Sequence, residues 1–293
     1  MTAPHLQALD AELTALPGTI SVWCARIDSD RPAYALAQNA THYAASTMKA
    51  AVLAALYRSG EAGILDLDAE VPVRNDFASA KPGAPRFTND QGYDQDDDVW
   101  DRLGATATLR WLARRMIIRS SNFATNLVLS HVGVPAVHEV LRLAGTSHMQ
   151  VNRGIEDASA REAGIDNLVT ARDLGALLSK IAVDAGYAAA HPGSEPLGKP
   201  ETCEAMLEVL FAQEHLEDLA AGLPPGTRIA HKNGWIEGVR HGAGVVFPAD
   251  APPYAIVVCT TTPLADSEDG DDACSLIARI AAASWADRHI LGD

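Results

Sequence analysis

Residues 46–58 read STMKAAVLAALYR, and this stretch decides how the rest of the chain is interpreted. It is rich in alanine and leucine and stops at Ser59-Gly60, a pattern that predicts a buried helix. Ser46 and Lys49 stand three residues apart at the start of that helix, where positions i and i+3 share a face. The hydroxyl and the amine can therefore touch. A lysine can act as a base at neutral pH when burial or a nearby cation lowers its pKa.

Two more polar motifs lie further along the chain, at residues 120–122 (Ser-Ser-Asn) and 232–235 (Lys-Asn-Gly-Trp). The first falls between two helical patterns, in a short loop that could point polar side chains into a cleft. The second ends a predicted strand, where a lysine would supply charge for an anionic substrate and a glycine would let backbone approach closely. Taken singly, each motif is equally well an ordinary helix cap, surface lysine or strand end.

The ends of the chain predict strands and its middle predicts helices. Helical patterns occur at residues 4–16, 107–118, 123–132, 135–144, 170–183, 201–213 and 273–289, and strand patterns at 20–27, 33–37, 228–232, 242–247 and 254–262. We therefore expect an α/β (α+β) fold, in which helices flank a five-stranded antiparallel sheet and an all-helical lobe is inserted. Residues 1–45 and 214–293 would form the α/β lobe and residues 46–213 the mainly helical lobe of one catalytic unit.

The composition excludes several classes of protein. The 293 residues are 47% hydrophobic, as in a globular protein with a real core, and the net charge of -15 argues against nucleic acid and anionic membranes as partners. The acidic stretch from Asp90 to Asp101 is expected to be a solvated loop. Four cysteines without CxxC spacing predict buried thiols, and no histidine pair indicates a metal, so no cofactor is expected. Without a signal-peptide pattern or an apolar span, a cytoplasmic location is expected, with export as the alternative if the start of the sequence was trimmed. The oligomeric state is not indicated.

The three motifs become specific when they are taken together. In the order SxxK, SxN and KxG, the chain resembles the serine β-lactamase and penicillin-binding protein superfamily, and it is most similar to the class A branch. The resemblance implies that Ser46 is acylated, that Lys49 helps to deprotonate it, and that Ser120 passes a proton to the leaving nitrogen. It also implies five substrate-binding residues. Asn122 would bind the amide side chain of the substrate, Lys232 would supply positive potential, and Asn233 would bind the substrate carboxylate. Gly234 and Trp235 would lie on the adjoining strand, where the backbone N–H of Trp235 and that of Ser46 would form an oxyanion hole.

Several positions depart from the class A pattern. The carboxylate that activates the deacylating water would be Glu156, in Arg153-Gly-Ile-Glu156, with Glu162 as the rival and an exposed loop acid as the alternative for either. The family's asparagine in this loop would fall near Ala160, whose side chain cannot bind water. Asn233 replaces a hydroxyl residue and Ser121 replaces an aspartate, while Arg240 with His241 falls where class A enzymes often offer a cation to the substrate carboxylate.

These observations support more than one function. The first is a class A-like hydrolase that opens the β-lactam amide through an acyl-enzyme. The second is an intracellular amidase, esterase or acyltransferase of the same fold, with glutaminases as one example. The third is a sensor that a β-lactam acylates without turnover, which the alanine at position 160 favours. In each case the expected partner is a small amide or ester.

Overall fold

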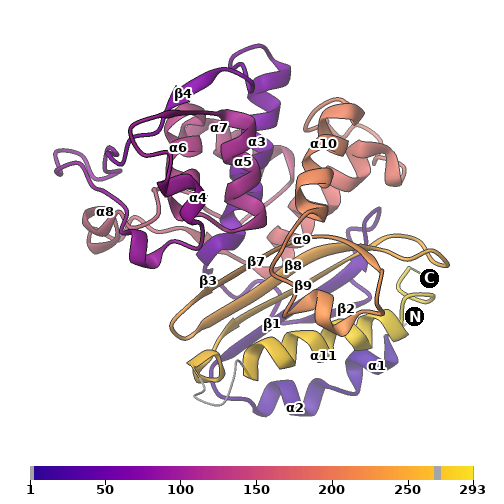
Figure 1. The fold of residues 1–293 in the computed structure, drawn as a ribbon. Helices are drawn as coiled ribbons and strands as arrows, with labels where there is room; N and C mark the ends of the chain where they lie inside the picture. The colour runs from indigo at the N-terminus through magenta and orange to yellow at the C-terminus, as the bar shows by residue number, and fades with distance from the viewer. Residues whose placement is uncertain (1–2, 267–271, 293) are drawn as a thin grey trace.

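The computed structural model describes residues 3–266 and 272–292 and is built on a five-stranded antiparallel sheet (Figure 1). The strand order is β2-β1-β9-β8-β7, so the first hairpin pairs with the last strand of the chain. The predicted fold class is confirmed. The strands are β1 (Thr19–Arg26), β2 (Tyr34–Leu36), β7 (Arg228–Ile236), β8 (Val239–Phe247) and β9 (Tyr254–Thr261).

Both faces of the sheet are covered by helices. The helices α1 (Pro4–Gln7), α2 (Asp10–Ala15) and α11 (Asp272–Ala286) lie on one face, and α9 (Ala171–Ala182) packs against β1, β8 and β9 on the other (Figure 1). Side chains alternate accordingly: Val22 and Val258 join the core under α11, whereas Trp23 and Val257 join the core that continues into the helical part. The sheet therefore separates two hydrophobic cores.

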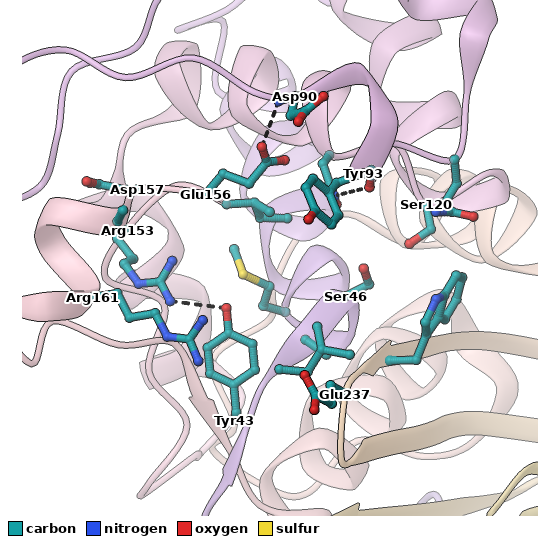
Figure 2. Close-up of a pocket in the computed structure, with 18 of the residues that line it drawn as sticks. Tyr43, Ser46, Asp90, Tyr93, Ser120, Arg153, Glu156, Asp157, Arg161 and Glu237 are labelled. Atoms are coloured by element: carbon teal, nitrogen blue, oxygen red, sulfur yellow. Dashed lines mark hydrogen bonds between the residues drawn. The ribbon is translucent and has the colours of Figure 1, made fainter. Parts of the chain in front are cut away.

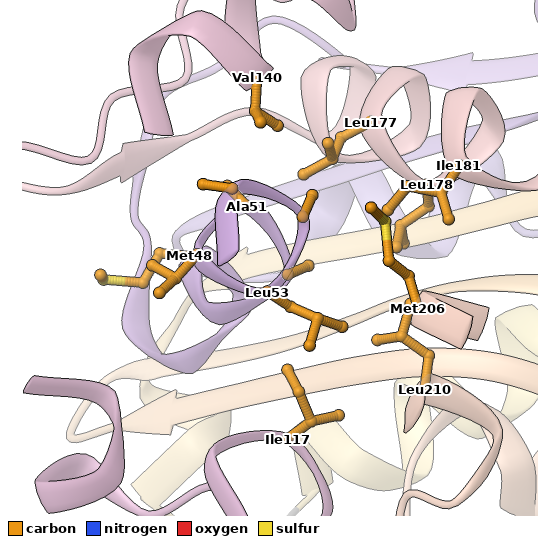
Figure 3. Close-up of a cluster of buried hydrophobic side chains, with 14 of the residues drawn as sticks. Met48, Ala51, Leu53, Ile117, Val140, Leu177, Leu178, Ile181, Met206 and Leu210 are labelled. Carbon is orange, nitrogen blue, oxygen red and sulfur yellow. The ribbon is translucent and has the colours of Figure 1, made fainter. Parts of the chain in front are cut away.

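The remaining helices surround α3 (Lys49–Glu61). Side chains of four neighbouring helices point at it in Figure 3, namely Ile117, Val140, Leu177, Leu178, Ile181, Met206 and Leu210. The prediction of a buried helix after Ser46 is confirmed, since every residue from Lys49 to Tyr57 is buried. The other helices of this part are α4 (Asp97–Trp100), α5 (Leu109–Ile118), α6 (Asn122–Val132), α7 (Val134–Leu143), α8 (Ala158–Glu162) and α10 (Pro200–Phe211).

Short elements complete the middle of the chain. Two small antiparallel pairs join β3 (His42–Tyr43) to β6 (Leu168–Val169) and β4 (Glu70–Pro72) to β5 (Thr106–Thr108). Single turns of tighter helix occur at η1 (Ala45–Met48), η2 (Gln91–Tyr93), η4 (Leu219–Gly222) and η5 (Pro263–Asp266), and a π-helical turn, η3 (Val183–Tyr187), follows α9. Helix α9 belongs to residues 46–213 yet packs on the sheet, so the two predicted lobes share a core. The boundaries between the lobes therefore stay a prediction.

The structure differs from the predicted elements in several places, among them the short strand pair β4–β5 in the lobe that we expected to be all-helical. The single helix expected at residues 4–16 is two helices, because the Asp287 carboxylate accepts hydrogen bonds from the His5 and Leu6 amides and docks α1 separately. Strand β7 also ends later than expected and β8 begins earlier, so the turn between them is only two residues long. All four cysteines are buried, as predicted. No helix in the described ranges has the length and apolar character needed to cross a membrane.

Candidate active site

A cleft of about 610 Å³ opens between the helical part of the molecule and the end of β7 (Figure 2). Five of the nine predicted site residues line it: Ser46, Ser120, Asn122, Glu156 and Trp235. The other four, Lys49, Lys232, Asn233 and Gly234, lie beneath its surface, and the side chains of Lys49, Lys232 and Asn233 are fully buried. The three motifs therefore meet in one place.

Ser46 is held where helix and sheet touch. It lies in the single turn η1, directly after Ala45, which has a left-handed φ of 45°. The edge strand β7 passes so close that a Cβ added to Gly234 would lie 2.8 Å from the Ser46 backbone nitrogen. Only glycine fits this approach. The close contact brings Trp235, the next residue of β7, to the cleft beside Ser46.

Lys49 begins α3, one turn after Ser46, and its amine is fully buried. The Nζ atom donates hydrogen bonds to the Ser120 carbonyl oxygen at 2.6 Å, to Ser120 Oγ at 3.2 Å and to Asn122 Oδ1 at 3.0 Å. Burial lowers the pKa of Lys49 to about 7, against a smaller opposing effect of the carboxylates Asp94 and Glu156. A substantial fraction of this amine is therefore neutral at pH 7 and able to accept a proton.

Ser120 lies between two amines. Its Oγ is 3.2 Å from Lys49 Nζ and 3.1 Å from Lys232 Nζ, and its backbone is left-handed with φ 59°. Burial, and next the charge of Lys49, hold the pKa of Lys232 well below its usual range. When both amines donate to this hydroxyl, its own proton is left to point elsewhere. The Ser120 hydroxyl is thus able to pass a proton into the cleft.

Asn233 and Arg240 do not lie where we expected a carboxylate-binding group. Asn233 is buried, and its Oδ1 accepts a hydrogen bond from Lys232 Nζ at 3.1 Å, so contact with a substrate carboxylate does not fit this placement. The Arg240 guanidinium lies over the Trp235 ring at 5.1 Å and binds Glu217 Oε1 at 2.8 Å. His241 is buried, and burial lowers its pKa to about 4, which leaves it neutral. Neither Arg240 nor His241 lines the cleft.

Asn122 is positioned by a carboxylate that the sequence analysis missed. Asp94 accepts hydrogen bonds from Ser121 Oγ at 3.1 Å, from the Asn122 amide at 3.1 Å and from the Phe123 amide at 2.8 Å. It thereby caps the start of α6, where a carboxylate is favourable. Ser121 stands where the usual motif has an aspartate, and here the Asp94 carboxylate comes to this motif from another loop.

The expectation of a merely solvated acidic loop is wrong for two of its residues. Besides Asp94, the side chain of Asp96 is buried and forms an ion pair with Arg115. The composition of residues 90–101 carried no signal for this, because Arg115 on α5 and the Asn122 and Phe123 amides of α6 lie outside this stretch. The loop therefore has a structural role at the cleft.

Glu156 faces the cleft, whereas Glu162 is exposed on α8 and does not line it. The Glu156 carboxylate accepts a hydrogen bond from Asn89 Nδ2 at 2.8 Å and another from the Asp90 amide at 2.7 Å (Figure 2). Burial raises the pKa of Glu156 above its ordinary value. The residue has a left-handed φ of 69°, a conformation that non-glycine residues adopt chiefly under constraint.

The backbone before Glu156 is clamped by a second residue that sequence analysis did not single out. Asn126 of α6 accepts a hydrogen bond from the Ile155 amide and donates one to the Ile155 carbonyl oxygen, both at 2.8 Å. Ala160, at the place of the family's asparagine, is buried in α8 and offers no polar atom to a water. Glu156 is thus fixed without the side-chain amide that the resemblance led us to look for.

The described part of the chain contains no group of three or more His, Cys, Asp or Glu side chains that could hold a metal ion. The cleft instead brings together Ser46, the buried Lys49 and Ser120 from the helical part of the molecule, beside the end of β7. This arrangement is typical of the class of proteins in which a serine is paired with a lysine.

Comparisons with known proteins agree with this class. A family described as the β-lactamase enzyme family matches residues 5–286. A β-lactamase of Streptomyces fradiae is 26% identical over 246 residues, which are 83% of this chain and 74% of that protein. A β-lactamase of Streptomyces lavendulae is 27% identical over 176 residues, or 59% of this chain, and the match spans only about half, 54%, of that relative.

The fold is shared with solved structures as well. The β-lactamase from Sphaerobacter thermophilus DSM 20745 superimposes with a TM-score of 0.77 at 21% identity, and the match covers 98% of both chains. The chain belongs to the β-lactamase enzyme family.

Proposed function

We propose that the protein is a class A-like serine β-lactamase, in which Ser46 attacks the amide carbonyl of a β-lactam and water then hydrolyses the acyl-enzyme. The observation that carries this proposal is the buried amine of Lys49, with its pKa lowered to about 7, one turn from a serine that lines the cleft. A structural lysine has no reason to be fully buried beside a second lysine, because each charge penalises the other. The family match supports the same activity.

Acylation in this proposal requires the Ser46 hydroxyl to meet the Lys49 amine, whose hydrogen bonds described above run to Ser120 and Asn122. Neutral Lys49 takes the proton of the Ser46 hydroxyl as the oxygen attacks the carbonyl carbon. The negative charge on the carbonyl oxygen is stabilised by the backbone N–H groups of Ser46 and Trp235. Ser120 donates its proton to the β-lactam nitrogen as the C–N bond breaks, and it recovers a proton from the lysine beside it.

Deacylation depends on Glu156. In this proposal its carboxylate accepts a proton from a water molecule that attacks the ester of Ser46, and the serine leaves with a proton returned by the same network. The raised pKa of Glu156 suits a general base, but Ala160 supplies no second contact for the water. We therefore propose that deacylation is the slower of the two steps.

The test is intact-mass spectrometry after incubation with benzylpenicillin, with hydrolysis of a chromogenic cephalosporin followed by absorbance. Wild type should gain the mass of one penicillin and release product continuously, whereas Ser46→Ala should do neither. Glu156→Gln should accumulate the adduct, because acylation survives while hydrolysis stops. Glu162→Gln is the matched control on the same segment and should turn over like wild type. Equal turnover in Glu156→Gln and wild type would exclude Glu156 as the base.

A second function is favoured by one observation, the alanine at position 160. If wild type itself forms a lasting adduct and releases no product, the protein is a β-lactam-binding sensor. If Ser46 gains no mass from either compound, β-lactams are not substrates. The same measurements should then be repeated with small esters and amides, the substrates of the amidase, esterase and acyltransferase alternatives.

A further inference from the structure

The cleft contains a cationic side chain that the proposed acyl-transfer chemistry does not use. Two arginines line it, Arg153 and Arg161. Arg153 is buried, and its guanidinium binds Asp166 at 3.1 Å and the Tyr43 hydroxyl at 3.1 Å. Arg161 is exposed, and its guanidinium lies over the Tyr43 ring at 5.4 Å. Within residues 3–266 and 272–292, no carboxylate forms an ion pair with Arg161.

Four acidic residues line the cleft with Arg161, namely Asp90, Glu156, Asp157 and Glu237. The carboxylates of Asp90 and Glu156 accept hydrogen bonds from Gly92 and Asn89, respectively. The Asp157 carboxylate accepts hydrogen bonds from Ser79 Oγ and the Ala80 amide, both at 2.7 Å, and from the Ala160 amide. Asp166 neutralises Arg153. Glu237, on the turn between β7 and β8, lines the cleft as well and would oppose an anion there. The charge of Arg161 is therefore available to a ligand.

The position of Arg161 tells which part of a substrate it would meet. In Figure 2, Ser46 lies between Ser120 on one side and the Tyr43–Arg161 pair on the other. The leaving nitrogen has to face Ser120, because that hydroxyl supplies its proton. The acyl part of the substrate, which stays on Ser46, then extends toward Arg161. Arg240 is paired with Glu217 and does not line the cleft. Of the two arginines that do line it, Arg161 is the exposed one and therefore the more accessible to an anion.

We propose that Arg161, stacked on Tyr43, binds a carboxylate carried by the acyl side chain of the substrate, so that the cleft selects acyl groups that are anionic. The inference rests on the proposed function and names its substrate class. An arginine over an aromatic face keeps the edge of its guanidinium free for a bidentate carboxylate contact, while the ring holds the plane in place.

The test uses two penicillins that differ by one carboxylate on the acyl side chain, carbenicillin and benzylpenicillin. Acylation of Ser46 is followed by intact mass, and the ratio of kcat/KM for the two compounds is the readout. Wild type should prefer carbenicillin. Arg161→Gln should reduce that ratio about two- to fivefold, as for an exposed ion pair, mainly through a slower reaction with carbenicillin. Arg161→Lys should retain part of the preference, and Glu237→Gln should increase it. Arg31→Gln, an exposed arginine outside the cleft, is the matched control.

The outcomes separate the inference from the function on which it rests. If benzylpenicillin acylates Ser46 but Arg161→Gln leaves the carbenicillin-to-benzylpenicillin ratio of kcat/KM unchanged, Arg161 does not bind the acyl carboxylate. The proposed function as a β-lactamase would still stand. If neither compound acylates Ser46, the proposed function is wrong. Reversible binding of the two penicillins to Ser46→Ala, measured by calorimetry, then decides the role of Arg161, and equal affinities would overturn it.

Discussion

Replacing Lys49 by methionine should stabilise the protein while abolishing acylation. The amine is fully buried, and burial lowers its pKa from 10.5 to about 7. Between these two pH values the unfolded chain holds a proton that the folded chain has released, so the free energy of unfolding rises with pH. The free-energy cost of holding the charged amine in the folded protein is fully present below about pH 7 and absent above about pH 10.5. At about 1.4 kcal/mol per pH unit, it amounts to about 4 kcal/mol at pH 7.

The substitution also removes hydrogen bonds. The Ser120 carbonyl oxygen loses the amine of Lys49 as its donor, which costs about 1–2 kcal/mol for a buried acceptor. The Ser121 carbonyl oxygen keeps the Thr125 amide and hydroxyl as donors. We therefore expect Lys49→Met to be about 2 kcal/mol more stable than wild type at pH 7, with the difference shrinking toward alkaline pH.

Urea unfolding of Lys49→Met and wild type at about pH 6.5, 8 and 9.5 measures this difference. Ser46→Ala, which keeps the buried amine, is the control and should follow the pH dependence of wild type. The reasoning would be refuted by a Lys49→Met variant that is less stable than wild type at pH 6.5. A difference in unfolding free energy between Lys49→Met and wild type that stays the same from pH 6.5 to 9.5 would also refute it. The stabilisation would then not come from removing a buried charge.

Three further predictions concern the same cleft. Gly234→Ala should slow acylation of Ser46 by at least about tenfold and lower the unfolding free energy by about 1–3 kcal/mol, because the added methyl overlaps the Ser46 amide. Acylation rates and urea unfolding test this. Asp94→Asn should lower the unfolding free energy by about 1–2 kcal/mol and reduce kcat/KM, whereas Asp97→Asn, an exposed neighbour, should change neither. The acylation rate should rise with pH and level off above about pH 7, as neutral Lys49 becomes available; a flat profile from pH 6 to 8 would contradict this base.

The elements that could be predicted from the sequence are those whose signal is local. The alternation in residues 20–27 and 254–262 reflects strands with one core on each face, and the alanine-rich run after Ser46 reflects a helix surrounded on all sides. The proximity of Ser46 and Lys49 follows from helical geometry alone. The five strands were expected for this reason, and the sheet confirms them.

What could not be predicted depends on contacts between distant segments. Asp94 and Asp96 lie in a stretch whose composition is that of a solvated loop, and only the packing of that loop on α5 and α6 gives them partners. Similarly, spacing alone left Glu156 and Glu162 open, and the hydrogen bond from Asn89 shows that Glu156 is the one held at the cleft. Arg240 was misplaced because its partner, Glu217, comes from a loop with no recognisable pattern.

The hydrogen bonds between residues 75–90 and 153–166 have a consequence for protein engineering. Glu156 is held by Asn89 and Asp90, and Asp157 by Ser79 and Ala80, so the two segments are joined at both acidic residues. Recombination with a relative that exchanges only one segment would leave carboxylates without their donors. Chimaeras should therefore inherit both segments from the same parent, as a single block, even though more than sixty residues separate them along the chain.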